Sequence, residues 1–443
     1  MSSARELAVK ILVKCEKERS YSNLEIKNAL KSADFSTADR AFLTQLVNGV
    51  LEKSIALDFY LKGFFRKSIR LSPFVKNILR LGAYQIIYLD RVPVSAACNE
   101  AVILAKKFAG KDSSGFVNGV LRNLSRNKDN LTLPDYSENP LLHLSVKYSL
   151  PQWIISLWQK SYGEEIALKL LEATIEKPLN TIRINNIKTD FDELREQLLS
   201  ENIKIEKSKL LENAAYIDLN RDLEGITSYE KGFFHIQDLS SQACCHILSP
   251  QKNETILDVC AAPGGKSFTI SELMENTGQI FALDLHEHRT LLIKKGAQRL
   301  GLKNIKTFCA DASKPLEFEK RSFDRILCDV PCSGLGVISK KPDIMFKSEE
   351  EIKELPELQL NILKNASEYL KKGGTLIYST CTLNHYENED IINAFIKGNS
   401  EFILKDINEV PENFTCINAK GYVTILPTKH CDGFFIAKLM RVE

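Results

Sequence analysis

The stretch TILDVCAAPGGKS, residues 255–267, decides the fold of the chain around it. Its first part, 256–259, has the largely aliphatic composition of a buried parallel strand. Two glycines, Gly264 and Gly265, let the chain turn tightly and let the backbone approach a ligand closely. A helix is expected to begin at Ser267. A strand, a glycine-rich turn and a helix N-terminus together form a site for a nucleotide-like or anionic group.

Three ligand classes fit this stretch, and a tight turn without a ligand is a fourth interpretation. A P-loop would explain GKS (265–267), but Cys260 stands where its first glycine belongs and Pro263 lacks an amide. A dinucleotide site would need G-x-G-x-x-G, which is not present here. An S-adenosylmethionine (SAM) site would place the turn at the amino-acid end of the cofactor and a later acid at the ribose. The stretch alone leaves these interpretations open.

The totals describe an ordinary globular protein. Its 443 residues are enough for two or three domains, and 44% are hydrophobic and 26% charged. We expect no membrane partner, because no uninterrupted run of about 18 apolar residues occurs. The first residues lack the apolar stretch and cleavage site of a signal peptide, so we expect a cytoplasmic protein.

Eleven cysteines occur without any C-x-x-C pair, and no His/Cys spacing suggests zinc. We therefore expect no metal site. Cys244, Cys245 and Cys309 lie in apolar runs and are expected to be buried thiols in a reducing compartment.

Charge is unevenly divided along the chain. Residues 1–130 hold 22 Lys+Arg against 12 Asp+Glu, a net charge of +10, and the remainder holds 37 against 45, a net charge of −8. A basic part on a nearly neutral protein favours a polyanionic partner, first of all nucleic acid. A solvated basic face is the alternative interpretation.

The first part of the chain is predicted to be helical. Apolar residues recur at helical spacing, Pro73 starts a helix with Ser72 as N-cap, and further helices are expected over 94–109 and from Gly115. Residues 127–140 are predicted to be a linker and 141–171 another helix, in which Trp153 and Trp158 serve packing.

Residues 178–230 change character to a short α+β unit. Strands are predicted at TIRINN, IKIEKS and AAYIDL, with a helix over 190–200. Arg183 and Lys204 of this unit are expected either to touch phosphate or to be simply exposed.

From Gly232 onward strands and helices alternate, which predicts a doubly wound parallel sheet with helices on both faces. Ligands of such sheets bind at the carboxyl ends of the strands. The predicted strands cover 256–259, 279–284, 305–309, 325–330 and 375–379, with helices over 267–275, 287–300, 349–370 and 387–397. A last, antiparallel strand is expected from 433–439.

Three carboxylates close successive strands. Asp284 is placed to accept hydrogen bonds from ribose hydroxyls, Asp311 is placed to accept from an adenine amino group, and Asp329 closes the fourth strand. Each acid alone is also a candidate helix cap, which is the commoner role.

Two cysteines follow the fourth and fifth strands. Cys332 lies in DVPCSG and Cys381 in YSTCT, and because these strands are adjacent we expect both thiols to face one crevice. A Walker-B interpretation of ILCD (326–329) gives neither thiol a task. Methylation of carbon 5 of cytosine gives both thiols a task. A thiolate attacks carbon 6, after which carbon 5 can take a methyl group. A second group then helps remove the carbon-5 proton.

AAPGGKS, DVPCSGLG and YSTCT together resemble the RNA 5-methylcytosine methyltransferases. The segments 36–51, 92–102 and 115–122 resemble the RNA-binding helical domain of NusB, and with the tail motif HCDGFF (430–435) the resemblance narrows to the RsmB/Sun family of bacterial 16S ribosomal RNA cytosine methyltransferases. It implies an all-α NusB-like RNA-binding domain over 1–130 and a helical linker with a small RNA-recognition-like α+β subdomain over 141–231. It also implies a Rossmann-like, seven-stranded, mostly parallel SAM-dependent methyltransferase domain over 232–443.

The resemblance also implies roles for single residues. Cys381 would be the nucleophile, Cys332 the thiol that assists product release, and Asp329 a contact to the cytosine edge near the methyl donor. SAM would be held by Cys260, Ala261, Ala262, Pro263, Gly264, Gly265, Lys266, Asp284, Asp311 and Asp329. Lys340 and Lys341 stand where relatives carry Arg or His in a basic loop, and Val330 stands where many have Ala; the first departure bears on contacts to RNA.

The expected function is SAM-dependent methylation of carbon 5 of a cytosine in 16S ribosomal RNA by a monomer, through a covalent cysteine–carbon 6 adduct. Alternatives are a non-catalytic RNA-binding or ribosome assembly factor that retains a SAM fold, a methyltransferase for another RNA, and an ATP-driven P-loop protein.

Overall fold

The computed structural model describes residues 3–18, 22–32, 35–66, 69–219 and 223–443. Its contacts divide the chain into two compact units, which we call the helical unit (Met1–Ile175 with Lys341–Ser348) and the catalytic unit (Glu176–Lys340 with Glu349–Glu443). The short segment Lys341–Ser348 therefore clusters with the first unit although it lies within the sequence of the second.

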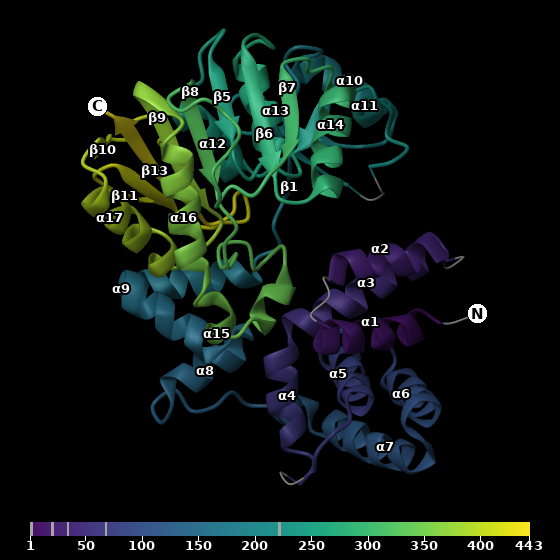
Figure 1. Ribbon diagram of the computed structural model, residues 1–443. Helices are drawn as coiled ribbons and strands as arrows, with labels where there is room; N and C mark the ends of the chain where they lie inside the picture. The colour runs from purple at the N-terminus through teal and green to yellow at the C-terminus, as the bar shows by residue number, and fades with distance from the viewer. Residues whose placement is uncertain (1–2, 19–21, 33–34, 67–68, 220–222) are drawn as a thin grey trace. The chain divides into compact units, whose positions relative to one another are not determined.

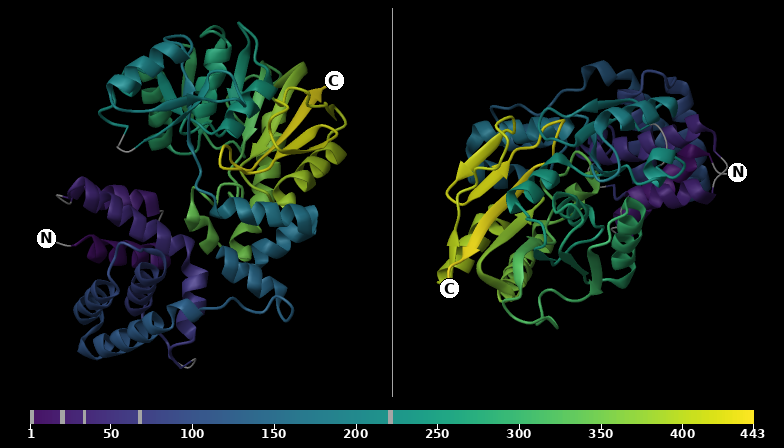
Figure 2. Two further views of the ribbon diagram at one scale, coloured as in Figure 1. Left: turned by 180° about the vertical axis from the view of Figure 1, so that it is seen from behind. Right: turned by 90° about the horizontal axis from the view of Figure 1, so that it is seen from above.

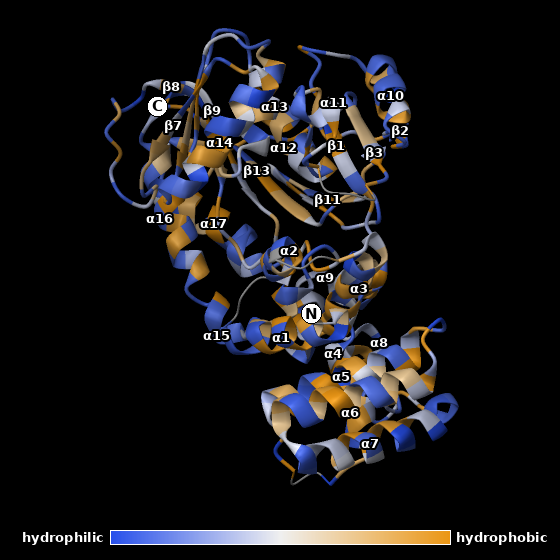
Figure 3. Ribbon diagram, turned by 90° about the vertical axis from the view of Figure 1, so that its right-hand side faces the viewer, coloured by the Kyte–Doolittle hydropathy of each residue, from blue (hydrophilic) through white to orange (hydrophobic). Residues whose placement is uncertain are grey.

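The helical unit is built from amphipathic helices around one apolar core, which includes Leu12, Leu43, Leu79 and Leu121. The orange and blue residues alternate along α5, α6 and α7 in Figure 3, as expected of helices with one buried face. The elements of this unit (Figure 1) are α1 (Ala4–Glu18), α2 (Ser22–Ser32), α3 (Thr37–Glu52), α4 (Ser54–Lys62), α5 (Pro73–Tyr88), α6 (Val94–Ala109), α7 (Lys111–Arg126), η1 (Lys128–Asn130), α8 (Pro140–Tyr148), α9 (Gln152–Ile175) and η2 (Pro342–Phe346).

Helix starts in this unit follow local capping chemistry. Helix α5 begins at Pro73, and the Ser72 hydroxyl accepts a hydrogen bond from the Val75 amide at 3.3 Å, which confirms the predicted N-cap. Helix α7 begins at Lys111 and not at Gly115 as predicted, because the break is at Gly110, whose φ of 87° is outside the helical region.

Residues 141–171 are largely helical as predicted, but they form two helices and not one. Helix α8 ends at Ser149, which adopts a left-handed conformation with φ 55°, and Pro151 precedes α9. Within α9, Gly163 has φ 79° and kinks the helix. Trp158 is buried in this helix, as the packing interpretation predicts.

The small α+β part of the catalytic unit is a four-stranded antiparallel sheet in the order β2-β3-β1-β4. The Asp190 carboxylate caps α10 by accepting from the Glu193 amide at 2.9 Å. The elements here are β1 (Asn180–Ile184), α10 (Phe191–Ser200), β2 (Ile205–Lys207), β3 (Ala214–Ile217), α11 (Thr227–Glu230) and β4 (Phe234–Ile236).

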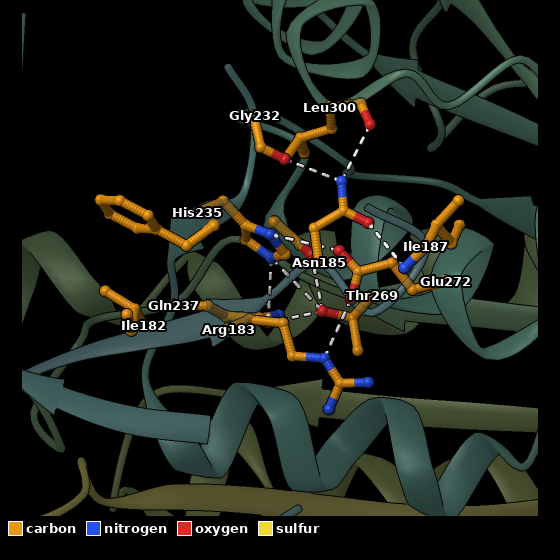
Figure 4. Close-up of polar contacts among 12 residues, drawn as sticks. Ile182, Arg183, Asn185, Ile187, Gly232, His235, Gln237, Thr269, Glu272 and Leu300 are labelled. Atoms are coloured by element: carbon orange, nitrogen blue, oxygen red, sulfur yellow. Dashed lines mark hydrogen bonds and ion pairs between the residues drawn. The ribbon is translucent and has the colours of Figure 1, made fainter. Parts of the chain in front are cut away.

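The expectation that Arg183 touches phosphate or is exposed is wrong. Arg183 is 0% exposed, and its Nε lies 3.0 Å from Glu272 Oε2 (Figure 4). Its Nη1 donates to the Glu212 carbonyl at 3.2 Å and lies 3.3 Å from His246 Nε2. Arg183 therefore links the small sheet to α13, a helix of the larger sheet in the same unit. Lys204, by contrast, is exposed.

A second buried group completes this junction. His235 on β4 lies with Nδ1 3.6 Å from Glu272 Oε1, and burial lowers the pKa of its imidazole to about 3. The Asn185 amide donates to the carbonyls of Gly232 and Leu300 at 2.8 and 2.9 Å (Figure 4). The Asn185 amide is thus satisfied where the two sheets of the unit meet, whereas His235 Nδ1 and Glu272 Oε1 are buried without a hydrogen bond.

The large sheet has the order β11-β12-β13-β9-β8-β5-β6-β7, and β10 also pairs with β13. Strands β9, β8, β5, β6 and β7 are parallel and β13 is antiparallel to β9, as predicted. Its elements are α12 (Leu239–Leu248), β5 (Thr255–Asp258), α13 (Gly265–Leu273), β6 (Gln279–Asp284), α14 (Glu287–Leu300), β7 (Ile305–Cys309), β8 (Phe323–Asp329), α15 (Glu349–Ile352), α16 (Leu355–Ser367), β9 (Leu370–Thr380), η3 (His385–Glu387), α17 (Glu389–Gly398), β10 (Phe402–Leu404), β11 (Cys416–Ala419), β12 (Tyr422–Ile425) and β13 (Phe434–Arg441).

Helices cover both faces of the large sheet, which makes it a Rossmann-like layer. Side chains of α16 and α17 pack on one face, and side chains of α12, α13 and α14 pack on the other. The C-terminal strands, yellow in Figure 2, form one edge of this sheet. Within the described residues, the large sheet has nine strands where a seven-stranded sheet was predicted. Six of the nine correspond to the strands predicted with bounds, and the short strands β10, β11 and β12 are the other three.

Two further expectations need correction. Cys309 is exposed and not buried, because it ends β7 at the edge of the sheet, whereas Cys244 and Cys245 are fully buried. The helix predicted over 349–370 is divided into α15 and α16, because Pro356 has no amide hydrogen and starts a new helix.

Candidate active site

The glycine-rich turn joins β5 to α13. The Ala261 amide donates to the Leu283 carbonyl at 2.7 Å, and the Gly264 amide donates to the Ala261 carbonyl at 2.8 Å. Gly264 has φ 112°, and a Cβ atom there would lie 2.4 Å from the Phe268 ring. The first residues of α13 follow at once, so their amides face the end of the strand. Of the residues predicted to form the turn, Cys260, Ala261, Ala262, Pro263 and Gly264 form a compact loop with a cis bond between Ala262 and Pro263, and Gly265 and Lys266 are the first residues of α13.

Asp284 lies beside this turn, at the end of β6. It is 3% exposed, accepts a hydrogen bond from the His286 amide at 3.1 Å, and its Oδ2 lies 3.3 Å from Arg289 Nη1. Arg289 also donates to the Ala262 carbonyl at 3.0 Å. One arginine therefore links the carboxylate of β6 to the glycine-rich turn, a contact that the sequence did not indicate.

Asp311 follows β7 and has local partners. Its Oδ1 accepts from the Ser313 hydroxyl and amide at 2.6 and 3.0 Å, and Lys314 lies 3.2 Å from Oδ2. The hydrogen bond from Ser313 lowers the pKa of the Asp311 carboxyl below its ordinary value. These are the contacts of a turn cap, the alternative interpretation for this acid, and they leave the carboxylate partly exposed.

Lys266 and Asp329 form an ion pair at the ends of α13 and β8. Their Nζ and Oδ2 atoms are 2.7 Å apart, and the Ser379 hydroxyl donates to Asp329 Oδ1 at 2.8 Å. Lys266 Nζ also lies 5.0 Å from the centre of the Phe434 ring. Burial lowers the pKa of the lysine, but the Asp329 carboxylate more than offsets this, so the pKa is raised above its ordinary value.

The two predicted thiols lie together. Strands β8 and β9 pair in parallel with Asp329 opposite Ser379, and Cys332 Sγ and Cys381 Sγ are 3.3 Å apart. No disulfide joins them. The hydrogen bond to Cys381, together with burial, raises the pKa of the Cys332 thiol. Either sulfur can donate the hydrogen bond that joins the two thiols.

Lys340 of the basic loop is paired with carboxylates of the protein itself, so it does not offer a free charge to RNA. Its Nζ lies 2.5 Å from Asp238 Oδ2 and 2.9 Å from Asp432 Oδ1, so its charge is used inside the catalytic unit. Lys341 is exposed. Asp432 belongs to the tail motif HCDGFF, and the adjacent Gly433 amide donates to the Gly336 carbonyl at 2.9 Å. The tail motif thus packs beside the loop that follows Cys332.

Several residues that hold this site were not predicted. Ser379 immediately precedes the TCT motif, and its position opposite Asp329 in the parallel pair was a usable signal. Glu387 and Gln359 are both 0% exposed, and nothing in their local sequence distinguishes them from surface residues. Among the described residues, no group of three or more His, Cys, Asp or Glu side chains could hold a metal ion.

The helices in the described part of the chain include none with the length and apolar character to cross a membrane. Three family models match the chain. The model for 16S rRNA methyltransferase RsmB/F matches residues 245–440, the NusB family model matches 2–126, and the model for the ferredoxin-like domain of RsmF/B-like methyltransferases matches 150–224.

A similar curated protein is the probable ribosomal RNA small subunit methyltransferase B of Bacillus subtilis (strain 168). It is 42% identical over 445 residues, covering 99% of each chain. The crystal structure of PH0851 covers 100% of this chain and 99% of its own, with TM-score 0.84 and 24% identity, a likeness of fold. The crystal structure of NSun6 from Pyrococcus horikoshii with SFG covers 66% of this chain and 98% of its own, with TM-score 0.59 and 25% identity. The chain belongs to the RsmB/Sun family of SAM-dependent 16S ribosomal RNA methyltransferases.

Proposed function

We propose that the protein methylates carbon 5 of a cytosine in 16S ribosomal RNA through a covalent cysteine–carbon 6 adduct. The observation that carries this proposal is the 3.3 Å separation of Cys332 Sγ and Cys381 Sγ beside the Lys266–Asp329 ion pair. A methyl transfer to an oxygen or an amino nitrogen has no use for two adjacent thiols. Carbon 5 of cytosine needs a nucleophile at carbon 6 before it can accept a methyl group.

The residues at the strand ends fit SAM. Asp284 supplies a buried carboxylate for the ribose hydroxyls, Asp311 an acceptor for the adenine amino group, and the turn 260–266 with the first amides of α13 supplies donors for the carboxylate of the cofactor. Asp329 completes the set near the reacting end. When bound, SAM supplies an electrophilic methyl group. The same donor set fits ATP poorly, because the proline-containing turn lacks the amides of a P-loop.

Cys381 is proposed as the nucleophile. The protonated Cys332 can donate a hydrogen bond to a thiolate at Cys381, and such a bond favours the charged form of the acceptor. The thiolate is the reactive form of cysteine. Attack then forms the bond between Cys381 Sγ and carbon 6, and electron density moves to carbon 5.

Asp329 and Cys332 are proposed to act on the base. Asp329 contacts the cytosine edge at N3 or N4. To do so it gives up part of its hydrogen bonding to Lys266 and Ser379 and bonds the base instead. Cys332 is proposed to lose its own thiol proton to solvent and then to accept the carbon-5 proton after methylation, so that the carbon 5–carbon 6 double bond re-forms and Cys381 leaves as a thiolate.

The remaining parts of the chain are proposed to bind the substrate. Residues 1–130 would form an RNA-binding domain, residues 141–231 a linker with an RNA-recognition-like subdomain, and residues 232–443 the methyltransferase domain. The NusB and ferredoxin-like matches support this division. The proposal further includes action in the cytoplasm as a monomer without a resident metal.

The first experiment transfers labelled methyl from SAM into protein-free 16S ribosomal RNA from unmodified cells, followed by digestion to nucleosides. Label in 5-methylcytidine is the expected result. Label in another nucleoside would refute the two-thiol chemistry. If only another RNA is labelled, the chemistry stands and the substrate is wrong, and if no RNA or assembled small subunit is labelled, a non-catalytic assembly factor becomes the better interpretation.

The two cysteine variants separate the proposed roles. We expect Cys381→Ala to abolish methyl transfer, because no adduct can form. We expect Cys332→Ala to form the adduct and fail to release it, which leaves a slowly migrating protein–RNA band on a denaturing gel. An exchange of these two phenotypes would show that the roles have been assigned the wrong way round.

A further inference from the structure

A buried carboxylate, Glu387, collects hydrogen bonds from three segments of the catalytic unit. Glu387 ends η3 and is 0% exposed. Its donors are the Ser333 amide (2.8 Å), the Ser333 hydroxyl, Gln359 Nε2 (2.9 Å) and Asn384 Nδ2 (2.9 Å). Each carboxylate oxygen accepts two of these bonds, which uses the roughly four lone-pair sites of the group.

These bonds hold the backbone on both sides of Cys332. Ser333, the next residue, is fixed by Glu387 through its amide and its hydroxyl. Pro331, the preceding residue, has its carbonyl held by Gln359 Nε2 at 2.9 Å. Because Gln359 donates to both Pro331 and Glu387, one buried pair of side chains fixes the position of the Cys332 thiol.

Cys381 has separate backbone support. Its carbonyl accepts from the Gly336 amide at 3.0 Å, and the carbonyl of the next residue, Thr382, accepts from Asn388 Nδ2 at 3.0 Å. Asn388 also accepts from the Thr380 hydroxyl at 2.6 Å. The Glu387 side chain is linked to this side through the hydroxyl of Ser333, which lies 2.6 Å from the Thr382 hydroxyl, and the Glu387 carbonyl accepts from the Tyr378 hydroxyl at 2.6 Å. The two sulfurs are thus positioned by two adjacent sets of buried side chains.

We propose that Glu387, together with Gln359, is a positioning residue that holds Cys332 at the distance from Cys381 needed to release the methylated product. The inference rests on the proposed two-thiol function and deepens it. Neither side chain touches the reacting atoms. A displacement of about 1 Å at a reacting group can cost a factor of about 100 in rate, so a side chain that fixes the Cys332 backbone controls the release step.

The competing interpretation is that Glu387 serves the fold alone. In that case its loss lowers the fraction of folded protein and slows adduct formation and product release in equal proportion. If Glu387 acts through Cys332, its loss slows release more than formation, and the covalent adduct accumulates. The ratio of the two rates therefore distinguishes the interpretations where total activity does not.

The experiment measures single-turnover methyl transfer to 16S ribosomal RNA with the full-length protein. The variants are Glu387→Gln, which turns one acceptor oxygen into a donor facing two donors, and Gln359→Met, which removes both bonds of that amide. We expect adduct formation within about threefold of wild type and release slowed by about tenfold or more. Gln359→Met carries the test alone if Glu387→Gln does not fold.

The matched control is Asn388→Ala, a buried residue of the same region that supports the Cys381 side. We expect this variant to slow adduct formation without trapping the adduct. The same adduct-to-product ratio in Asn388→Ala and Glu387→Gln would overturn the proposal, since both would then act only through the fold.

A double variant gives the second readout. If Glu387 acts through Cys332, Cys332→Ala/Glu387→Gln forms the trapped adduct as fast as Cys332→Ala alone, because the positioned group is already missing. Slower adduct formation in the double variant would contradict the proposal. Failure of the proposed function looks different: wild type would then give no 5-methylcytidine and Cys332→Ala no adduct, whereas failure of this inference alone leaves both results in place.

Discussion

Gly264 is the residue of the glycine-rich turn at which a side chain is least tolerated. Its φ of 112° is unfavourable for an L-residue, and the Phe268 ring occupies the space of a Cβ. The same ring also packs closely on Gly296 of α14, where a Cβ would likewise lie 2.4 Å from it. The Phe268 ring thus packs against both Gly264 and Gly296, and this packing leaves no room for a side chain in the turn.

We expect Gly264→Ala to lower the free energy of unfolding by about 1–3 kcal/mol and to weaken SAM binding by about tenfold or more. Urea unfolding and titration calorimetry with SAM measure the two effects. Gly398→Ala is the control: Gly398 ends α17, has open space around it, and is expected to bind SAM like wild type. Equal behaviour of the two variants would mean that the turn tolerates a side chain.

At the same scale, the positions of the proposed reacting residues were easier to predict than those of the residues that hold them. Cys332 and Cys381 stand in distinctive motifs at the ends of adjacent strands, so their proximity followed from strand order. The partners of Glu387 are distant in sequence: Gln359 is 28 residues away and Ser333 is 54 residues away. Arg183 was misjudged because its partner Glu272 lies 89 residues further on, and an isolated strand does not reveal which face is covered.

At the scale of elements, β1 and α13 are joined by the Arg183–Glu272 ion pair. Both side chains are at most 1% exposed. Burial raises the pKa of the Glu272 carboxyl, and Arg183 opposes that rise. Removing one member leaves a buried polar group without its partner, whereas removing both leaves an apolar contact.

We expect Arg183→Met to destabilise the protein by about 3–5 kcal/mol and Arg183→Met/Glu272→Leu to recover most of that loss. Chemical unfolding of the single and double variants measures the coupling. The exposed pair Lys252–Glu275, at 2.7 Å, is the control, and Lys252→Met should change stability by less than about 1 kcal/mol. A double variant as unstable as Arg183→Met would contradict this account.

The regular elements themselves were largely predictable. The five parallel strands and their helices have long periodic patterns, and the antiparallel last strand was placed correctly from 433–439. The errors fall where one residue interrupts a helical pattern, as at Pro151 and Pro356, or where strands are only three or four residues long. The apolar pattern continues across such a proline, so it does not mark the end of the helix. A strand of three or four residues is too short to show an alternating apolar pattern.

At the scale of the whole molecule, the division of charge predicts how binding depends on salt. Arg122, Arg126 and Lys128 are exposed on and just after α7 of the basic part. We expect replacement of all three by Gln to reduce the slope of log affinity for 16S ribosomal RNA against log salt by roughly 0.7–0.9 per lost phosphate contact. Binding titrations between low and moderate salt measure this slope.

The control for that experiment carries the same change of charge in the acidic part of the chain. Lys364, Lys372 and Lys397 are exposed residues of the catalytic unit. If their replacement by Gln reduces the slope as much as replacement of the basic residues of α7, the first 130 residues are not the main electrostatic contact, and the proposed RNA-binding role of that region is wrong.

The segment Lys341–Ser348 has a consequence for dissecting the protein. The polypeptide crosses from one unit to the other at three places, before Glu176, before Lys341 and before Glu349, so no single proteolytic cut yields two whole halves. A fragment from Glu176 onward would keep the eight-residue segment 341–348 but lack the rest of the helical unit, with which this segment clusters. Ile344 and Met345, which are buried in the full-length protein, would then be exposed. An exposed apolar segment of this kind promotes self-association. A chimera that takes the helical unit from a relative therefore also has to take residues 341–348 from that relative.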